Sequence, residues 1–146
     1  MTSTCHVCRA QKLIDSVDSL SIFIEKGAPD GHEVTYKDSA DEFLNVRAGP
    51  VIFKVQQLSH SKFQRVGNDL KVRVNISLRE ALLGFSREIT HLDGHVVNID
   101  REGKTTKPGL LERFKGEGMP VFEHYGDFGD LMVTYIVDMP QVLSDE

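Results

Sequence analysis

Residues 71–78 have the sequence KVRVNISL, in which every second side chain is apolar. Alternation with a period of two predicts a β-strand that turns one face to a core and the other to water. A sheet with one wet face is typical of antiparallel architectures rather than doubly wound ones. This stretch therefore predicts an all-β fold built from antiparallel sheets.

The same pattern predicts further strands on both sides of this stretch. Leu20, Ile22 and Ile24 alternate within the sequence SLSIFI and share one face of a predicted strand at residues 19–24. Three more strands are predicted at residues 32–36, 51–55 and 131–137.

Short turn and cap signals separate the predicted strands. Ser77 and Glu80 have the spacing of a capping box, which predicts a short helix that ends at Gly84. Asp93-Gly94 lies between two apolar runs and predicts a β-hairpin with a type I′ turn.

The chain is predicted to form two consecutive domains. The strand pattern breaks over residues 58–68, which are rich in Ser, His, Lys, Gly and Asn. We place the boundary there, giving domains at residues 1–57 and 58–146. In the second domain, the glycines of residues 116–120 (GEGMP) lack the Lys-Ser/Thr continuation of a phosphate loop and are expected to serve a turn.

Charge and hydropathy exclude two classes of partner. The 17 basic and 22 acidic residues give a net charge of −5, whereas a nucleic-acid-binding domain carries a basic surplus. No apolar run approaches the roughly 20 residues that span a bilayer. We therefore expect neither a nucleic-acid partner nor a membrane span.

Cys5 and Cys8 are the only cysteines and form a C-x-x-C motif. A structural zinc needs four ligands, and the redox role of this motif needs a βαβ context that the predicted strands do not provide. Three interpretations stay open: free thiols, a local disulfide, or half of a zinc site severed from an upstream partner. The motif predicts an excised piece of a longer protein, with no cofactor of its own.

No other pattern indicates an enzyme, a metal site or a carbohydrate-binding domain. The sequence contains neither G-x-S-x-G nor H-E-x-x-H, and its carboxylates are scattered. His91 and His95 flank the predicted turn and are expected to be ordinary surface histidines, so no metal ligand is predicted. The absence of Trp and the low aromatic content of 8% argue against a carbohydrate-binding sandwich.

In their order and spacing, these elements resemble the C-terminal half of a DnaJ-type (J-domain) co-chaperone. Each motif alone is weak, but together they extend over nearly the whole chain. Beyond the cysteine motif they are residues 29–31 (PDG), 49–53 (GPVIF), 63–70 (FQRVGNDL), 76–84 (ISLREALLG), 91–94 (HLDG), 115–120 (KGEGMP) and 126–131 (GDFGDL).

The cysteine motif resembles the DnaJ class with a cysteine-rich insert, but it departs from the usual repeat C-x-x-C-x-G-x-G. Cys8 is followed by RAQK, without the glycines that wrap a zinc-bound thiolate. This is similar to the members of the endoplasmic reticulum lumen, whose cysteines form disulfides, and residues 89–95 (ITHLDGH) also resemble that branch. The resemblance implies a lumenal location, with the cytoplasm as the alternative, and a parent protein that carries zinc or disulfides in its insert.

The resemblance implies two consecutive antiparallel β-sandwich or barrel-like domains with little helix, the first of them lacking its upstream strands. No J domain is expected in this piece. A dimerisation helix is expected beyond Pro140 in the parent protein, which would then be a homodimer.

The resemblance also implies a peptide-binding role. In this family the first β-domain adds an extended apolar segment of an unfolded client alongside a strand, and its side chains enter a pocket. The corresponding pocket residues are Leu20 and Phe53, to which we add Ile22, whereas Ile24 and Val55 are assigned to the core. Alternation alone would place all five in the core.

The implied partners are unfolded polypeptides and, through the parent protein, an ATPase chaperone of the DnaK/BiP type. The alternative is a structural spacer or dimer scaffold of the same co-chaperone, with little client binding of its own.

Overall fold

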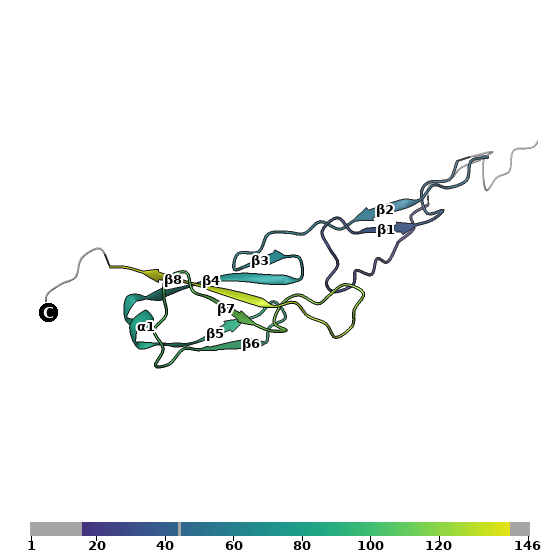
Figure 1. Ribbon diagram of the computed structural model, residues 1–146. Coiled ribbons are helices and arrows are strands. Elements are labelled where there is room, and N and C mark those ends of the chain that lie inside the picture. The colour runs from purple at the N-terminus through teal and green to yellow at the C-terminus, as the bar shows by residue number, and fades with distance from the viewer. Residues whose placement is uncertain (1–15, 44, 141–146) are drawn as a thin grey trace, which may run out of the picture. The chain divides into compact units, whose positions relative to one another are not determined.

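The computed structural model describes residues 16–43 and 45–140, which form a first unit that ends at Gln57 and a second that begins at Leu58 (Figure 1). The described residues contain eight strands and one short helix. The strands form three separate sheets, none of which closes into a barrel. The predicted all-β fold class is confirmed. Cys5 and Cys8, with their predicted zinc or disulfide chemistry, lie outside the described residues.

The first unit contains a two-stranded antiparallel sheet of β1 (Glu33–Tyr36) and β2 (Val51–Lys54). Val34 of β1 lies opposite Phe53 of β2. The preceding turn ends at Gly31, whose φ of 81° is easily reached only without a Cβ. These two strands agree with the predicted ones.

Residues 16–25 form no strand, so the prediction of a strand at residues 19–24 is wrong. Alternation determines which side chains share a face, but a strand also needs a partner that pairs its backbone N–H and C=O groups. In the described part of the chain this segment has no strand partner. It is held instead by the Tyr36 hydroxyl, which donates to the Ser21 carbonyl at 2.7 Å.

The second unit is built on a four-stranded sheet with the order β3-β4-β8-β7. Its strands are β3 (Phe63–Val66), β4 (Asp69–Ser77), β7 (Leu111–Phe114) and β8 (Leu131–Asp138). The central pair β4–β8 is parallel, so the expectation of purely antiparallel sheets is wrong for this pair. A parallel pair needs a long crossover connection, and residues 78–130 provide one.

A separate hairpin joins β5 (Ser86–Thr90) to β6 (Val96–Asp100). The hairpin is where the sequence predicts it, but its turn is not type I′. That type requires positive φ at both central residues, and φ is positive at Gly94 (94°) but not at Asp93. Gly94 donates from its backbone N–H to the His91 carbonyl at 3.1 Å, within a loop that is longer than two residues.

The helix α1 (Leu78–Leu83) has the predicted capping box, in which the Ser77 and Glu80 side chains each accept from the other's backbone N–H. It ends at Gly84, where a Cβ would lie 2.3 Å from the Arg101 carbonyl oxygen. Among the described residues, no helix is long and apolar enough to cross a membrane.

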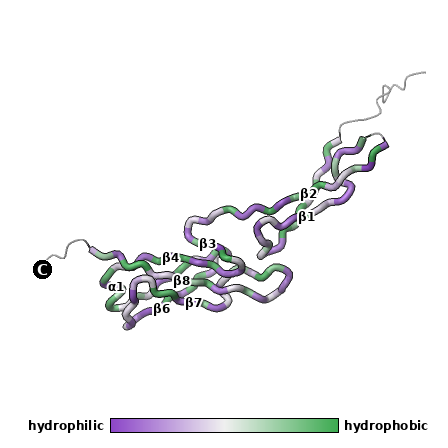
Figure 2. Tube along the Cα trace, turned by 45° about the horizontal axis from the view of Figure 1, so that its top comes forward, coloured by the Kyte–Doolittle hydropathy of each residue, from purple (hydrophilic) through white to green (hydrophobic). Residues whose placement is uncertain are grey.

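The hydrophobic core lies in the second unit, where sheet, helix and hairpin each bury their apolar side chains. Figure 2 shows hydrophobic and hydrophilic residues alternating along the chain of this unit. The buried residues are Phe63, Leu70, Val72, Ile76, Ala81, Phe85, Val97, Ile99, Leu131, Val133 and Tyr135. In the described part of the first unit, by contrast, the only buried hydrophobic residue is Ala48.

Candidate peptide-binding site

The three predicted pocket residues lie in the first unit at different depths. Leu20 and Ile22 are 41% and 39% exposed. Phe53 is half-buried on β2. An apolar side chain that is half in water has surface left to bury against a ligand, which a core side chain does not have. This exposure fits a binding surface.

Tyr36 connects the two parts of this candidate site. Its ring packs edge-on against Phe53, with 5.8 Å between the ring centroids and 87° between the ring planes. Its hydroxyl donates to the carbonyl of Ser21, the residue between Leu20 and Ile22. One side chain therefore holds the segment with the two aliphatic residues against the strand with the aromatic one.

No sequence pattern distinguished Tyr36 from the other residues of its predicted strand. Its residue type alone was a signal, because a tyrosine that ends a half-buried strand presents a ring to pack and a hydroxyl that needs a partner. The partner itself could not be predicted, because Ser21 is 15 residues away and offers only its backbone.

The described part of the first unit leaves many other large apolar side chains exposed. They are Val17, Phe23, Ile24, Phe43, Val46 and Ile52, with exposed fractions between 53% and 98%. The assignment of Ile24 to the core is therefore wrong, since this side chain is 53% exposed, while Val55 is half-buried. Large exposed apolar surface is typical of regions that bind other polypeptides.

The sheet edges of the first unit provide backbone groups for such a ligand. In the described residues β1 and β2 pair only with each other, so each strand has one edge without a strand partner. Its ion pairs, Lys54 with Glu33 at 3.9 Å and Arg47 with Asp38 at 2.9 Å, are solvent-exposed and contribute little. Apolar contacts and backbone hydrogen bonds are thus the interactions that this unit offers most.

Two predictions for the second unit have different outcomes. The His91 side chain is only 7% exposed, so it is not an ordinary surface histidine. The glycine-rich loop is a turn, as predicted, and a Cβ on Gly118 would lie 2.4 Å from the Gly129 backbone carbon. This glycine is needed where two backbone segments approach closely.

Comparison with known proteins gives the family of the chain. The model of the DnaJ C terminal domain family matches residues 4–140, and the chain belongs to this family. It is 42% identical over 139 residues to the "DnaJ homolog shv" of Drosophila melanogaster. It is 40% identical over 142 residues to the "DnaJ protein ERDJ3B" of Oryza sativa subsp. japonica, and 40% identical over 143 residues to the "DnaJ homolog subfamily B member 11" of Bos taurus.

These alignments cover 95% to 97% of this chain but only 39% to 40% of the relatives. The chain therefore spans about two fifths of the length of the curated relatives it matches. The resemblance seen in the sequence is confirmed at the level of the family, which is one of co-chaperones.

Proposed function

We propose that the first unit binds extended apolar segments of unfolded proteins by adding them alongside a strand. Backbone hydrogen bonds along a sheet edge would supply affinity that tolerates many sequences, and pockets for alternate side chains would select large apolar residues. Unfolded clients share a backbone and exposed apolar side chains but no common sequence, so a chaperone benefits from this combination.

The observation that carries the proposal is the arrangement around Tyr36. This residue joins the exposed Leu20 and Ile22 to the ring of Phe53, in a unit whose described apolar side chains are mostly uncovered. Burying such side chains contributes about 1.5–3 kcal/mol each when burial is complete.

We further propose that the parent protein delivers its clients to an ATPase chaperone of the DnaK/BiP type in the endoplasmic reticulum lumen, and that it does so as a homodimer. Membership of the DnaJ family supports the chaperone partner. Similarity to a protein named ERDJ3B supports the compartment. Sedimentation of the full-length parent, and its localisation in cells, test the dimer and the compartment.

Client binding is tested with a fluorescent extended peptide rich in Leu and Phe, titrated with the chain and with the variants Leu20→Asp and Phe53→Asp. We expect saturable binding by the unmutated chain and a loss of affinity of about 10- to 100-fold in each variant, because a carboxylate in the pocket must be desolvated. Ser16→Asp is the matched control, since it adds the same charge at an exposed polar position of the same segment.

The control should bind the peptide as tightly as the unmutated chain does, and two-dimensional NMR spectra should show that every variant keeps its fold. Equal losses in all three variants would contradict a defined pocket.

The alternative is that the chain acts mainly as a structural spacer. Its favouring observation is the core, which lies in the second unit. The absence of saturable peptide binding by the unmutated chain would favour the role of a structural spacer. Binding that depends on Leu20 and Phe53 would contradict it.

A further inference from the structure

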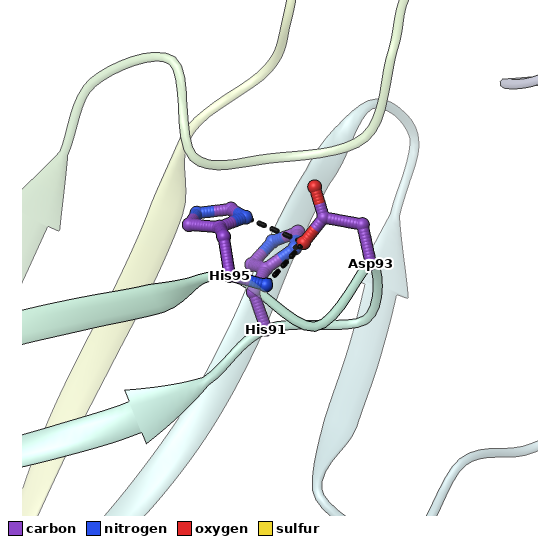
Figure 3. A group of neighbouring side chains, drawn as sticks. All are labelled: His91, Asp93 and His95. Atoms are coloured by element: carbon purple, nitrogen blue, oxygen red, sulfur yellow. Dashed lines mark hydrogen bonds and ion pairs between the residues drawn. The ribbon is translucent and has the colours of Figure 1, made fainter.

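Three side chains of the β5–β6 loop direct ligand atoms at one point (Figure 3). The Nδ1 atoms of His91 and His95 lie 3.3 Å and 2.5 Å from the same atom, Oδ1 of Asp93. The two imidazole rings stack, with 4.6 Å between their centroids. This loop lies in the second unit and shares no residue with the candidate peptide-binding site.

The outer nitrogen of each histidine is held by Glu117. Nε2 of His91 lies 3.0 Å from the Glu117 carbonyl oxygen, and Nε2 of His95 lies 2.6 Å from the Glu117 carboxylate. These oxygens only accept, so both Nε2 atoms carry a hydrogen. In a neutral histidine the lone pair is then on Nδ1, the atom that faces Asp93.

His91 provides a second, independent indication of a ligand. Its side chain is 93% buried, and its Nδ1 makes no hydrogen bond in the structure, although Asp93 is near. A buried nitrogen without a hydrogen-bond partner lowers the stability of the folded chain. In native proteins such an atom usually binds an ion or a water molecule or has a functional role.

We propose that His91, Asp93 and His95 form a binding site for a divalent transition-metal ion of the zinc class. Two imidazole nitrogens and one carboxylate oxygen are a donor set that Zn²⁺ accepts, with water as the fourth ligand. All three ligand atoms lie within 4.8 Å of one another. The site depends neither on the proposed peptide binding nor on the cysteines.

One pair of ligand atoms already has the spacing that such an ion requires, and the other side chains must rotate to reach it. Ligands about 2.0–2.1 Å from a tetrahedral ion lie about 3.3 Å apart, which is the separation of the His91 and Asp93 atoms. The His95 and Asp93 atoms are closer than this because they form a hydrogen bond. Asp93 is 67% exposed, so its carboxylate is free to rotate away as the ion takes the place of the proton between them.

Glu117 would serve as a positioning residue for this site. Histidines that ligate metals usually donate their other N–H to a carboxylate or a backbone carbonyl, and Glu117 offers both. Its loop is fixed by hydrogen bonds from Gly118 to the Gly129 carbonyl at 2.9 Å and from Met119 to the Asn68 carbonyl at 2.8 Å. Bound metal would therefore fasten the β5–β6 loop to the loop that follows β7.

A proton is the competing occupant, because the carboxylates of Glu117 and Asp93 raise the pKa of His95. Calorimetric titration with Zn²⁺ alone distinguishes the two. The protein is the full chain without an affinity tag, carrying Cys5→Ser and Cys8→Ser so that thiol groups do not compete for the ion. We expect one ion per chain and shifts of the His91 and His95 imidazole NMR signals, with those of His32, His60 and His124 unchanged.

The variants then test the geometry. Asp93→Asn should weaken Zn²⁺ binding at least tenfold, and Glu117→Gln by about 10- to 100-fold, as the loss of a partner that orients a ligand does. His124→Gln is the matched control and should leave the affinity unchanged. Circular dichroism checks the fold of each variant.

Two results would overturn the proposal. The first is the absence of saturable Zn²⁺ binding by the chain in which His91, Asp93 and His95 are intact, which would mean that only a proton occupies the site. The second is binding that shifts other histidine signals, or that is equally strong in the Asp93→Asn chain, which would mean adventitious coordination. Assigned histidine NMR signals of the chain with an intact site show where Zn²⁺ binds even if a variant fails to fold.

Discussion

At the scale of single residues, Tyr36 and Gly129 are each constrained by a close contact with the backbone of another segment. The hydroxyl of Tyr36 holds an extended segment that no strand pairs with in the described structure. At Gly129 the missing side chain matters, because a Cβ there would lie 2.0 Å from the Asn68 carbonyl oxygen. A substitution at each position tests the contact.

Tyr36→Phe keeps the ring against Phe53 but removes the hydrogen bond to Ser21. A hydrogen bond of this kind contributes about 0.5–1.5 kcal/mol, so peptide affinity should fall by up to about tenfold while the fold is kept. Fluorescence anisotropy with the Leu- and Phe-rich peptide measures the change. Unchanged affinity would show that the segment with Leu20 and Ile22 is not held for binding by this bond.

Gly129→Ala should destabilise the second unit by about 3 kcal/mol, because the methyl group meets backbone atoms that cannot move aside alone. Gly103→Ala is the control: φ there is 67°, but a Cβ would meet nothing within 4 Å, so the cost is about 1 kcal/mol. Urea unfolding followed by circular dichroism measures both. Equal costs would mean that the close approach to Asn68 relaxes easily.

At the scale of elements, the start of α1 is fixed by a local electrostatic arrangement. The backbone N–H of Ser77, the Arg87 guanidinium and the Ser77 hydroxyl donate to the Glu80 carboxylate. The Ser77 backbone bond and then the Arg87 hydrogen bond lower the pKa of Glu80 from 4.5 to about 2. The same contacts join the helix to β5, which carries Arg87.

Because the pKa of Glu80 is lower in the folded chain, its contribution to stability is complete above pH 4.5 and is lost as the pH falls towards 2. Glu80→Gln removes this dependence. At neutral pH we expect the variant to be less stable by about 1 kcal/mol, a value discounted for solvent screening, and the difference should shrink in acid. Urea unfolding of both proteins through this pH range measures it, and a constant difference would contradict the assignment.

At the scale of the whole molecule, the two units differ in how they are stabilised. The second unit has a continuous core around β4 and β8, with Leu131, Val133 and Tyr135 fully buried. The first unit, as described, has a two-stranded sheet and one buried hydrophobic residue, Ala48. A two-stranded sheet alone is only marginally stable in water.

We therefore expect a large difference in amide hydrogen exchange between the units. The amides of β4 and β8 should exchange only through global unfolding of the second unit, whereas those of β1 and β2 should exchange at least about a hundredfold faster. Exchange followed by NMR measures this directly. Equal protection in both units would show that the first unit is stabilised by contacts outside its described residues.

Local patterns predicted most of the strands and both helix ends. The capping box, the Gly84 terminus and the alternation of residues 71–78 and 131–137 all correspond to observed structure, because each depends on neighbours in the sequence. The strand at residues 19–24 was predicted on the same ground and is not formed. A strand depends on pairing with a distant segment, and alternation contains no information about that partner.

The candidate sites divide in the same way. Residue type and alternation indicated Leu20, Ile22 and Phe53, but not the exposure of Ile24 or the part played by Tyr36. His91 and His95 were recognised beside their turn, yet their relation to Glu117 was not predictable. That residue is 22 positions beyond His95 and is brought there by the chain after β7.

The sequence by itself determined the all-β class, the short helix with its caps, and the family to which the chain belongs, because periodicity, capping and motif order are written in adjacent residues. Only the tertiary structure decided that β4 and β8 pair in parallel, that the segment with Leu20 and Ile22 is held by a tyrosine hydroxyl, and that three ligand atoms converge beside Glu117. Each of these depends on contacts between segments far apart in the chain. Such contacts follow from how the whole core packs, which no local pattern specifies.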